Sequence, residues 1–130
     1  MPERRLLQPL AVGPLRLRNR VLFGAHFTMF TEPNPVWGEP GFHGRRYGRY
    51  LAERARGGVA AVIAGETAVA PNTAYKMPNN ANGWDPACVP HYAALTEQVH
   101  EHGALAFIQL THSGRRCSGT GRSRWRSRRR

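Results

Sequence analysis

Three short apolar segments alternate with two segments of helical periodicity, and this order constrains the fold more than any other feature of the sequence. The apolar segments are residues 21–25, 59–64 and 105–108, the last within a predicted strand over residues 104–110, and the helical segments are residues 43–56 and 88–102. Continuous apolar runs are typical of strands that are buried on both faces. A strand–helix–strand–helix–strand order predicts right-handed crossovers and a parallel sheet.

Each helical segment has one apolar face and a residue that ends it. Gly57 and Gly103 follow the last turns, and Pro90 suits a first turn. His43 and His91 lie near the starts of the helices, and we expect both to be solvated. The apolar faces consist of Tyr47, Tyr50, Leu51 and Ala55 in the first segment and Tyr92, Leu95 and Val99 in the second.

The remaining segments read as a hairpin and two long loops. Residues 6–18 contain two short, mainly apolar stretches, residues 10–12 and 15–17, on either side of the turn dipeptide Gly13-Pro14, and residues 15–18 alternate Leu and Arg, which predicts a small hairpin. Residues 31–42 and 71–85 are rich in Pro, Gly and Asn, so we predict loops there. Their length favours a functional role or local disorder.

The positive charge is concentrated at one end of the chain. The net charge is +11, but residues 115–130 hold eight Arg and no acidic residue, which leaves +3 for residues 1–114. A nucleic-acid-binding protein carrying an Arg-rich tail is therefore one alternative. The body lacks a matching pattern of basic and aromatic residues, which argues against it. No run approaches the roughly 20 apolar residues of a membrane span, and no signal-type apolar stretch follows the first residues, so we expect a cytoplasmic protein. Two Cys are too few for a disulfide framework.

Polar or small residues follow each apolar segment, where the strands of a parallel sheet place their ligands. Gly24 and Ala25 allow a ligand to approach the backbone closely. The amide of Gln109 suits the edge of a planar heteroaromatic ring, or it simply closes the strand. Glu66 is a candidate base, or a carboxylate that pairs with an Arg or caps a loop. His26 either faces a ligand or bonds to a neighbouring loop, and the same choice applies to His112.

Three stretches resemble the Old Yellow Enzyme family of FMN-dependent NADH:flavin oxidoreductases, and in particular its 2,4-dienoyl-CoA reductase-like branch. They are residues 6–22, 50–59 and 109–115. The third reads Gln-Leu-Thr-His-Ser-Gly-Arg and matches the family's Gln-Leu-x-His-x-Gly-Arg. The resemblance implies an α/β fold, a partial TIM (β/α)₈ barrel with its first three strands, two helices and an N-terminal hairpin.

The resemblance also implies where FMN is bound. The expected cofactor-binding residues are Gly24, Ala25, His26 and Phe27 at the end of the first strand, Glu66 at the end of the second, and Gln109 at the flavin pyrimidine edge. Ala25-His26 stands where the family often has Pro-Met, and Glu66 where it has a small residue. NAD(P)H is the expected co-substrate, with hydride passing through the flavin to a small, electron-poor acceptor such as an alkene.

Much of a complete barrel is missing, because such a fold needs about 250 residues. We expect residues 1–116 to be the N-terminal part of the FMN-binding domain and residues 117–130 to be a disordered Arg/Ser/Gly-rich tail, an out-of-frame end to a truncated reading frame. The family's proton donor lies beyond this region, so no catalytic residue is assigned. The branch's 4Fe-4S cysteines are also missing, and Cys117 is not a substitute for them.

An incomplete barrel leaves surfaces uncovered. We expect an inner sheet face built from residues such as Leu22, Val62 and Phe107, and sheet edges that invite self-association. The chain is then expected to be inactive alone and unable to hold FMN tightly. The other alternative is a non-catalytic half-barrel that completes itself with a partner chain.

Overall fold

A computed structural model describes residues 4–26, 28, 30–32, 41–70 and 81–112. Phe27 and the Arg-rich segment 115–130 lie outside the described residues. The elements in chain order are η1 (Arg5–Leu7), β1 (Leu10–Val12), β2 (Leu15–Leu17), β3 (Leu22–Phe23), β4 (Thr31–Glu32), β5 (Phe42–His43), α1 (Arg45–Arg56), β6 (Ala61–Ala68), β7 (Ala81–Asn82), α2 (Cys88–His100) and β8 (Leu105–Thr111).

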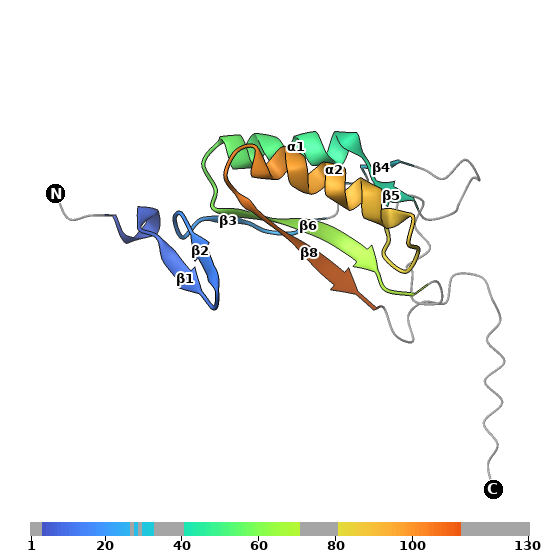
Figure 1. The fold of residues 1–130 in the computed structure, drawn as a ribbon, viewed down its shortest axis with the longest axis horizontal. Helices are drawn as coiled ribbons and strands as arrows, with labels where there is room; N and C mark the ends of the chain where they lie inside the picture. Colours follow the sequence, from blue (N-terminus) through green and yellow to red (C-terminus); the bar gives the residue numbers. More distant parts are fainter. Residues whose placement is uncertain (1–3, 27, 29, 33–40, 71–80, 113–130) are drawn as a thin grey trace, which may run out of the picture.

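The main sheet is parallel, with β6 in its centre. β3 pairs with the first part of β6, β7 with the last part, and β8 with nearly its whole length. Both helices cover the same face of this sheet, and no described element covers the other face (Figure 1). The predicted fold class, a partial (β/α)₈ barrel with three main strands, two helices and a hairpin, is confirmed.

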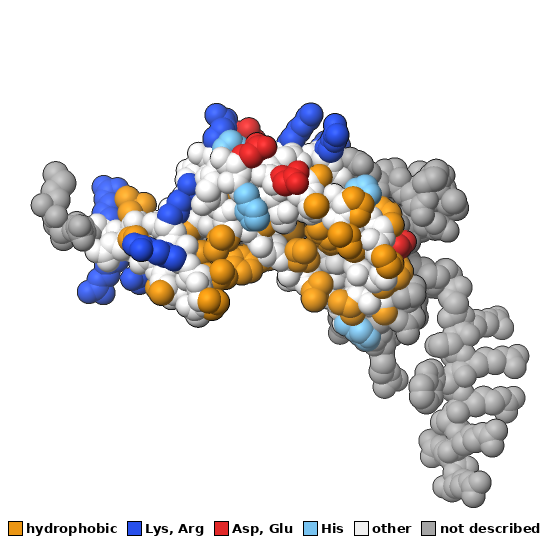
Figure 2. Space-filling view, in the orientation of Figure 1, with side chains coloured by type: hydrophobic (Ala, Val, Ile, Leu, Met, Phe, Trp, Pro, Cys, Tyr) orange, Lys and Arg blue, Asp and Glu red, His pale blue; other side chains and the backbone are white. Residues whose placement is uncertain are grey.

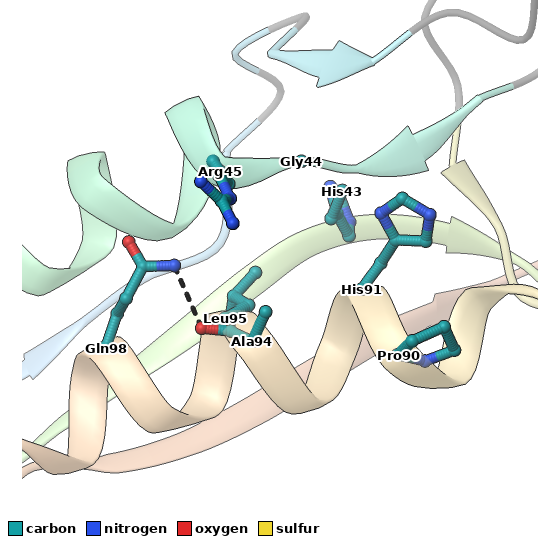
Figure 3. Close-up of a pocket in the computed structure, with 8 residues that line it drawn as sticks. All are labelled: His43, Gly44, Arg45, Pro90, His91, Ala94, Leu95 and Gln98. Atoms are coloured by element: carbon teal, nitrogen blue, oxygen red, sulfur yellow. Dashed lines mark hydrogen bonds between the residues drawn. The ribbon is translucent and has the colours of Figure 1, made fainter.

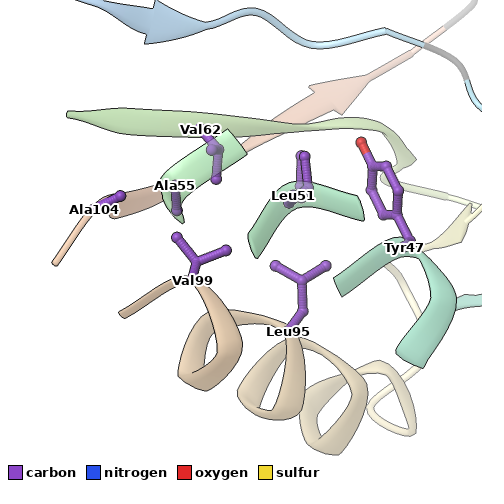
Figure 4. Packing of buried hydrophobic residues seen from close by; sticks show 8 residues of the cluster. Tyr47, Leu51, Ala55, Val62, Leu95, Val99 and Ala104 are labelled. Carbon is purple, nitrogen blue, oxygen red and sulfur yellow. The ribbon is translucent and has the colours of Figure 1, made fainter. Parts of the chain in front are cut away.

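The core lies between the two helices and the sheet (Figure 4). Leu51 of α1 and Val99 of α2 are fully buried against Val62 of β6. The prediction that Val62 lies on the uncovered face is therefore wrong. Leu22 and Phe107 do remain exposed, at 46% and 37% of their surface.

The hairpin of β1 and β2 packs at the end of the sheet where the strands begin (Figure 1). Gly13 adopts φ 54° in its turn, a conformation that favours glycine. Arg18, just after β2, donates to the carbonyls of His102 (2.8 Å), Ala55 (2.8 Å) and Val59 (2.7 Å). One guanidinium thus ties the hairpin to the segments that follow both helices.

The structure departs from the predicted boundaries in a few places. β6 continues through Glu66 to Ala68 instead of ending at Ala64. The short strands β4 and β7 fall inside the two predicted loops, and β5 includes His43, where the helix was predicted to begin; α1 begins at Arg45 instead. Two-residue strands are defined by their partners and carry no periodic signal. In the part of the chain that the structure describes, no helix is long and apolar enough to span a membrane.

Apolar side chains reach the surface over the strands and α2, while basic side chains gather over the hairpin and α1 (Figure 2). Leu110 of β8 is 67% exposed, and the outer edge of β8 has no partner strand among the described residues. This half of the sheet is therefore open both on its inner face and at its edge.

Candidate functional site

The second and third predicted site segments meet directly in the sheet. Ala64 pairs with Ile108 and Thr67 pairs with Leu110, so Gly65 and Glu66 together lie opposite the single residue Gln109. Two residues facing one is a β-bulge, a feature over-represented beside active sites. Glu66 and Gln109, which the sequence predicts as cofactor-binding residues, are thus neighbours across β6 and β8.

The first predicted site segment, described over residues 24–26, lies against the same bulge through the backbone of His26. A Cβ added to Gly65 would lie 2.5 Å from the carbonyl oxygen of His26 and 3.2 Å from the hydroxyl of Tyr47. Because the nearest atom belongs to the backbone, it cannot move aside as a flexible side chain would. Glycine is required at Gly65 by this close approach, which brings the end of β3 against the bulge.

Both backbone groups of Gly65 bond to side chains from the segment that begins α1. The Gly65 N–H donates to Tyr47 Oη at 2.6 Å, and His43 Nε2 donates to the Gly65 carbonyl at 2.8 Å. Beyond the bulge, Thr67 Oγ1 bonds to Tyr92 Oη of α2. Thr67 is 1% exposed, so this side chain is buried with the helices.

His43 is buried and uncharged. It is 7% exposed, and desolvation lowers its pKa from 6.5 to about 4, with the bond to the Gly65 carbonyl acting in the opposite direction. Since a carbonyl only accepts, the proton of the neutral ring is on Nε2, and the buried Nδ1 has no hydrogen-bond partner among the residues that the structure describes. The expectation that His43 is solvated is wrong.

The two tyrosines of this cluster are also shifted by burial. Desolvation raises the pKa of Tyr92 to about 12, and it raises the pKa of Tyr47 above 10.0. Both hydroxyls therefore keep their protons near neutral pH and act only through hydrogen bonds.

The imidazole of His26 lies in an aromatic cluster against α1. Its ring makes edge contacts with Phe23 (5.1 Å between centroids) and Tyr50 (5.4 Å), and its Nε2 bonds to Tyr50 Oη. The guanidinium of Arg54 lies 3.5 Å from the centroid of the Tyr50 ring. The side chain of His26 is held by the helix layer, while its carbonyl faces Gly65.

The other predicted residues offer backbone and amide groups. Nothing lies within 4 Å of a Cβ added to Gly24, so a ligand has space there. Ala25 and Glu66 are half-buried, and Gln109 is exposed. Gln109 lies on the sheet face opposite the helices, because side chains alternate along β8 and Ala106 packs in the helix-side core.

A second hollow lies outside the sheet, between α1 and α2 (Figure 3). It has a volume of about 190 Å³ and is lined by His43 and Arg45 near the start of α1 and by His91 and Leu95 of α2. None of the residues predicted to bind cofactor lines it. His43 contacts both sites, because its side chain lines this hollow and its Nε2 bonds to the Gly65 carbonyl in the bulge.

The residues that support the bulge carry no sequence motif, although the spacing of one of them is a signal. Tyr47, Leu51 and Ala55 recur every four residues, so a helix that buries Leu51 also brings Tyr47 to the sheet, whereas His43 lies in β5 before the helix begins. For Thr67 no local signal exists, because its inward direction depends on the bulge.

Comparisons with known proteins agree with this picture. A profile of the NADH:flavin oxidoreductase / NADH oxidase family matches residues 5–127. A probable N-methylproline demethylase of Rhizobium meliloti is 40% identical over 116 residues, which cover 89% of this chain and 16% of that protein. A multifunctional alkene reductase/demethylase of Caballeronia cordobensis is 34% identical over 115 residues, or 85% of this chain and 15% of that protein.

The fold has matches among solved structures as well. Morphinone reductase in complex with tetrahydroNAD superimposes with a TM-score of 0.70 and 27% sequence identity, over 86% of this chain and 28% of that one. The chain thus spans about a sixth of the length of the curated relatives and little more than a quarter of the solved reductase.

Proposed function

Because the chain belongs to the NADH:flavin oxidoreductase / NADH oxidase family, we propose that it supplies the first three strand ends of an FMN site in an oxidoreductase of this family. The observation that carries the proposal is the bulge, which sets Glu66 beside Gln109 while the His26 carbonyl closes on Gly65. The family predicted from the motifs is confirmed, and the 2,4-dienoyl-CoA reductase-like branch stays a prediction.

The described residues have groups that fit a flavin ring. Gln109 presents an amide with two donors and an acceptor, which matches the alternating polar atoms of a pyrimidine edge. The backbone around Gly24 and Ala25 leaves space for the flat ring to approach. When bound, FMN supplies hydride transfer between NAD(P)H and the acceptor, and the residues of this chain hold and orient it.

The relatives point to two substrate classes. One is named for demethylation of N-methylproline and the other for both alkene reduction and demethylation. We propose a small-molecule substrate that either gives up hydride from a carbon next to nitrogen or accepts hydride at an electron-poor alkene. A cytoplasmic location is part of the same proposal.

The open inner face favours a second element of the proposal, which is that the site works only when the barrel is completed. Leu22 and Phe107 are exposed on the sheet face that a barrel would enclose, and β8 has an open edge among the described residues. We expect the chain alone to self-associate through these surfaces and to turn over no substrate.

A graft tests the proposed function. Residues 5–112 replace the matched segment of the Rhizobium meliloti relative, and the purified chimera is titrated with FMN while flavin fluorescence is followed. We expect FMN binding that weakens about tenfold on Gln109→Leu, since loss of an amide hydrogen bond costs about 1–1.5 kcal/mol.

The matched control is Thr96→Val, which removes a hydroxyl bonded to the Ala93 carbonyl of α2 and touches no part of the site. A chimera that folds without binding flavin contradicts the proposal. If the Gln109→Leu and Thr96→Val chimeras bind FMN with equal affinity, Gln109 does not contact the flavin.

A further inference from the structure

We propose that His43 and Tyr47 are positioning residues that hold the Gly65–Glu66 bulge in shape and thereby fix Glu66 opposite Gln109. The consequence for flavin binding rests on the proposed function, whereas the effect on the bulge does not. Neither residue lies on the sheet face that carries Gln109; both act from the helix side, through one peptide segment.

The first step is where the backbone groups of Gly65 go. In a regular strand both groups bond to neighbouring strands, and a buried group without a partner is costly. Here Tyr47 Oη accepts from the Gly65 N–H and His43 Nε2 donates to the Gly65 carbonyl. Two side chains therefore bond to both backbone groups of the bulged residue.

The second step is that these two side chains form a pair. His43 ends β5 and Tyr47 lies in the first turn of α1, four residues later. Their rings lie 4.6 Å apart between centroids, with an angle of 35° between the planes. One supplies a donor and the other an acceptor, which is the complement of the carbonyl and N–H that a single residue presents.

The third step is that the bulge has few other means of support. Gly65 has no side chain, and the close His26 carbonyl excludes one. On the far side, Thr67 Oγ1 bonds to Tyr92 Oη and also lies 3.4 Å from His43 Nε2. Glu66 thus lies between two fixed points, Gly65 and Thr67, and His43 contacts both of them.

The positioning role requires a hydrogen-bond donor at position 43, which the neutral His43 ring supplies through Nε2. A leucine would fill much of the same buried volume but could not donate to the Gly65 carbonyl. A glutamine places an amide N–H close to the position of Nε2. Packing alone predicts that leucine serves at least as well as glutamine, whereas positioning predicts the opposite order.

The experiment is NMR on the full 130-residue chain, with backbone amide shifts and hydrogen exchange followed at Gly65, Glu66 and Gln109. Tyr47→Phe should speed exchange of the Gly65 amide about tenfold or more, because opening of this local unit becomes easier. His43→Leu should shift the Glu66 and Gln109 amides, and His43→Gln should return them toward wild type.

Thr96→Val serves as the control and should change none of the three amides. Unchanged Glu66 and Gln109 amides in His43→Leu, or equal behaviour of His43→Leu and His43→Gln, overturn the proposal. If His43→Leu fails to fold, Tyr47→Phe and His43→Gln still decide, since an unaltered Gly65 amide in Tyr47→Phe is equally fatal.

The flavin readout is separate. In the chimera described above, His43→Leu should weaken FMN binding and His43→Gln should restore it. A chimera that binds no FMN defeats the proposed function, while the amides of Gly65 and Glu66 in the chain itself still decide the positioning role.

Discussion

Acidification should lower the free energy of unfolding of this chain mainly through protonation of His43. The size of this loss follows from the pKa of His43 in the folded and unfolded chain. The folded-state pKa is about 4, whereas an exposed histidine has 6.5. Between these values the unfolded chain binds a proton that the folded chain does not. The contribution of neutral His43 to the free energy of unfolding is therefore fully present above pH 6.5 and is lost as the pH falls toward 4.

The magnitude follows from the pKa difference between the two states. At about 1.4 kcal/mol per pKa unit, the full loss is about 3 kcal/mol, and about 2 kcal/mol of it falls between pH 7 and pH 5. Net stabilities of domains are only about 5–15 kcal/mol. Tyr47 and Tyr92 do not contribute, because burial moves the pKa of each upward, away from this range.

The assay is urea unfolding followed by far-ultraviolet circular dichroism at pH 7 and pH 5, for wild type and for His43→Gln. Glutamine keeps an N–H for the Gly65 carbonyl but does not titrate, so the difference between the two pH responses isolates His43. We expect wild type to lose about 2 kcal/mol more than the variant over this range.

The result that refutes this reasoning is an equal loss of stability in both proteins. It would mean that His43 is protonated in the folded chain near pH 5, and hence that it is neither buried nor bonded as described. A larger loss in His43→Gln than in wild type would contradict the sign of the shift itself.

Further substitutions test other contacts, again by urea unfolding. Gly65→Ala should cost about 1–3 kcal/mol, because the new methyl group meets the backbone carbonyl at the end of β3; Gly24→Ala, where the space is open, should be close to neutral. Arg18→Ala should cost about 1–2 kcal/mol through the lost carbonyl bonds, and Arg16→Ala, exposed on β2, should not. Leu51→Ala should cost about 2–5 kcal/mol, as for other large-to-small core changes, and a loss below 1 kcal/mol would place Leu51 outside the core.

The order of strands and helices was predictable because its signals are local. The apolar face of α1 and the glycine at Gly57 mark one helix without reference to any other segment. The same holds for β8, where an apolar run leads into polar residues. The parallel arrangement then follows from connection rules that hold for nearly all such units.

The short strands were not predictable for the opposite reason. Ala81 and Asn82 belong to an Asn-rich segment and become β7 only because Thr67 and Ala68 of β6 pair with them. A strand of two residues has no periodicity, and its existence depends wholly on a distant partner. The antiparallel pair of β4 and β5 arises in the same way.

The candidate site also has features that a local sequence signal predicts and features that depend on distant contacts. Gln109 and Glu66 could be singled out because a polar side chain after an apolar run stands out locally. That they face each other across a bulge could not be predicted, since the extra residue in β6 is accommodated by His43 and Tyr47. The role of His43 and Tyr47 becomes visible only when the positions of α1 and β6 relative to each other are known.

The bulge makes the two faces of the sheet depend on each other. In a regular strand every second side chain points to the same face, so three positions after Ala64 the chain would point away from the helices. The extra residue returns Thr67 to the helix side, where it is buried against Tyr92. The same irregularity places Glu66 beside Gln109. A substitution that relaxes the polar contacts under the helices should therefore alter the inner face as well, so that stability and site geometry cannot be tuned independently at this end of β6.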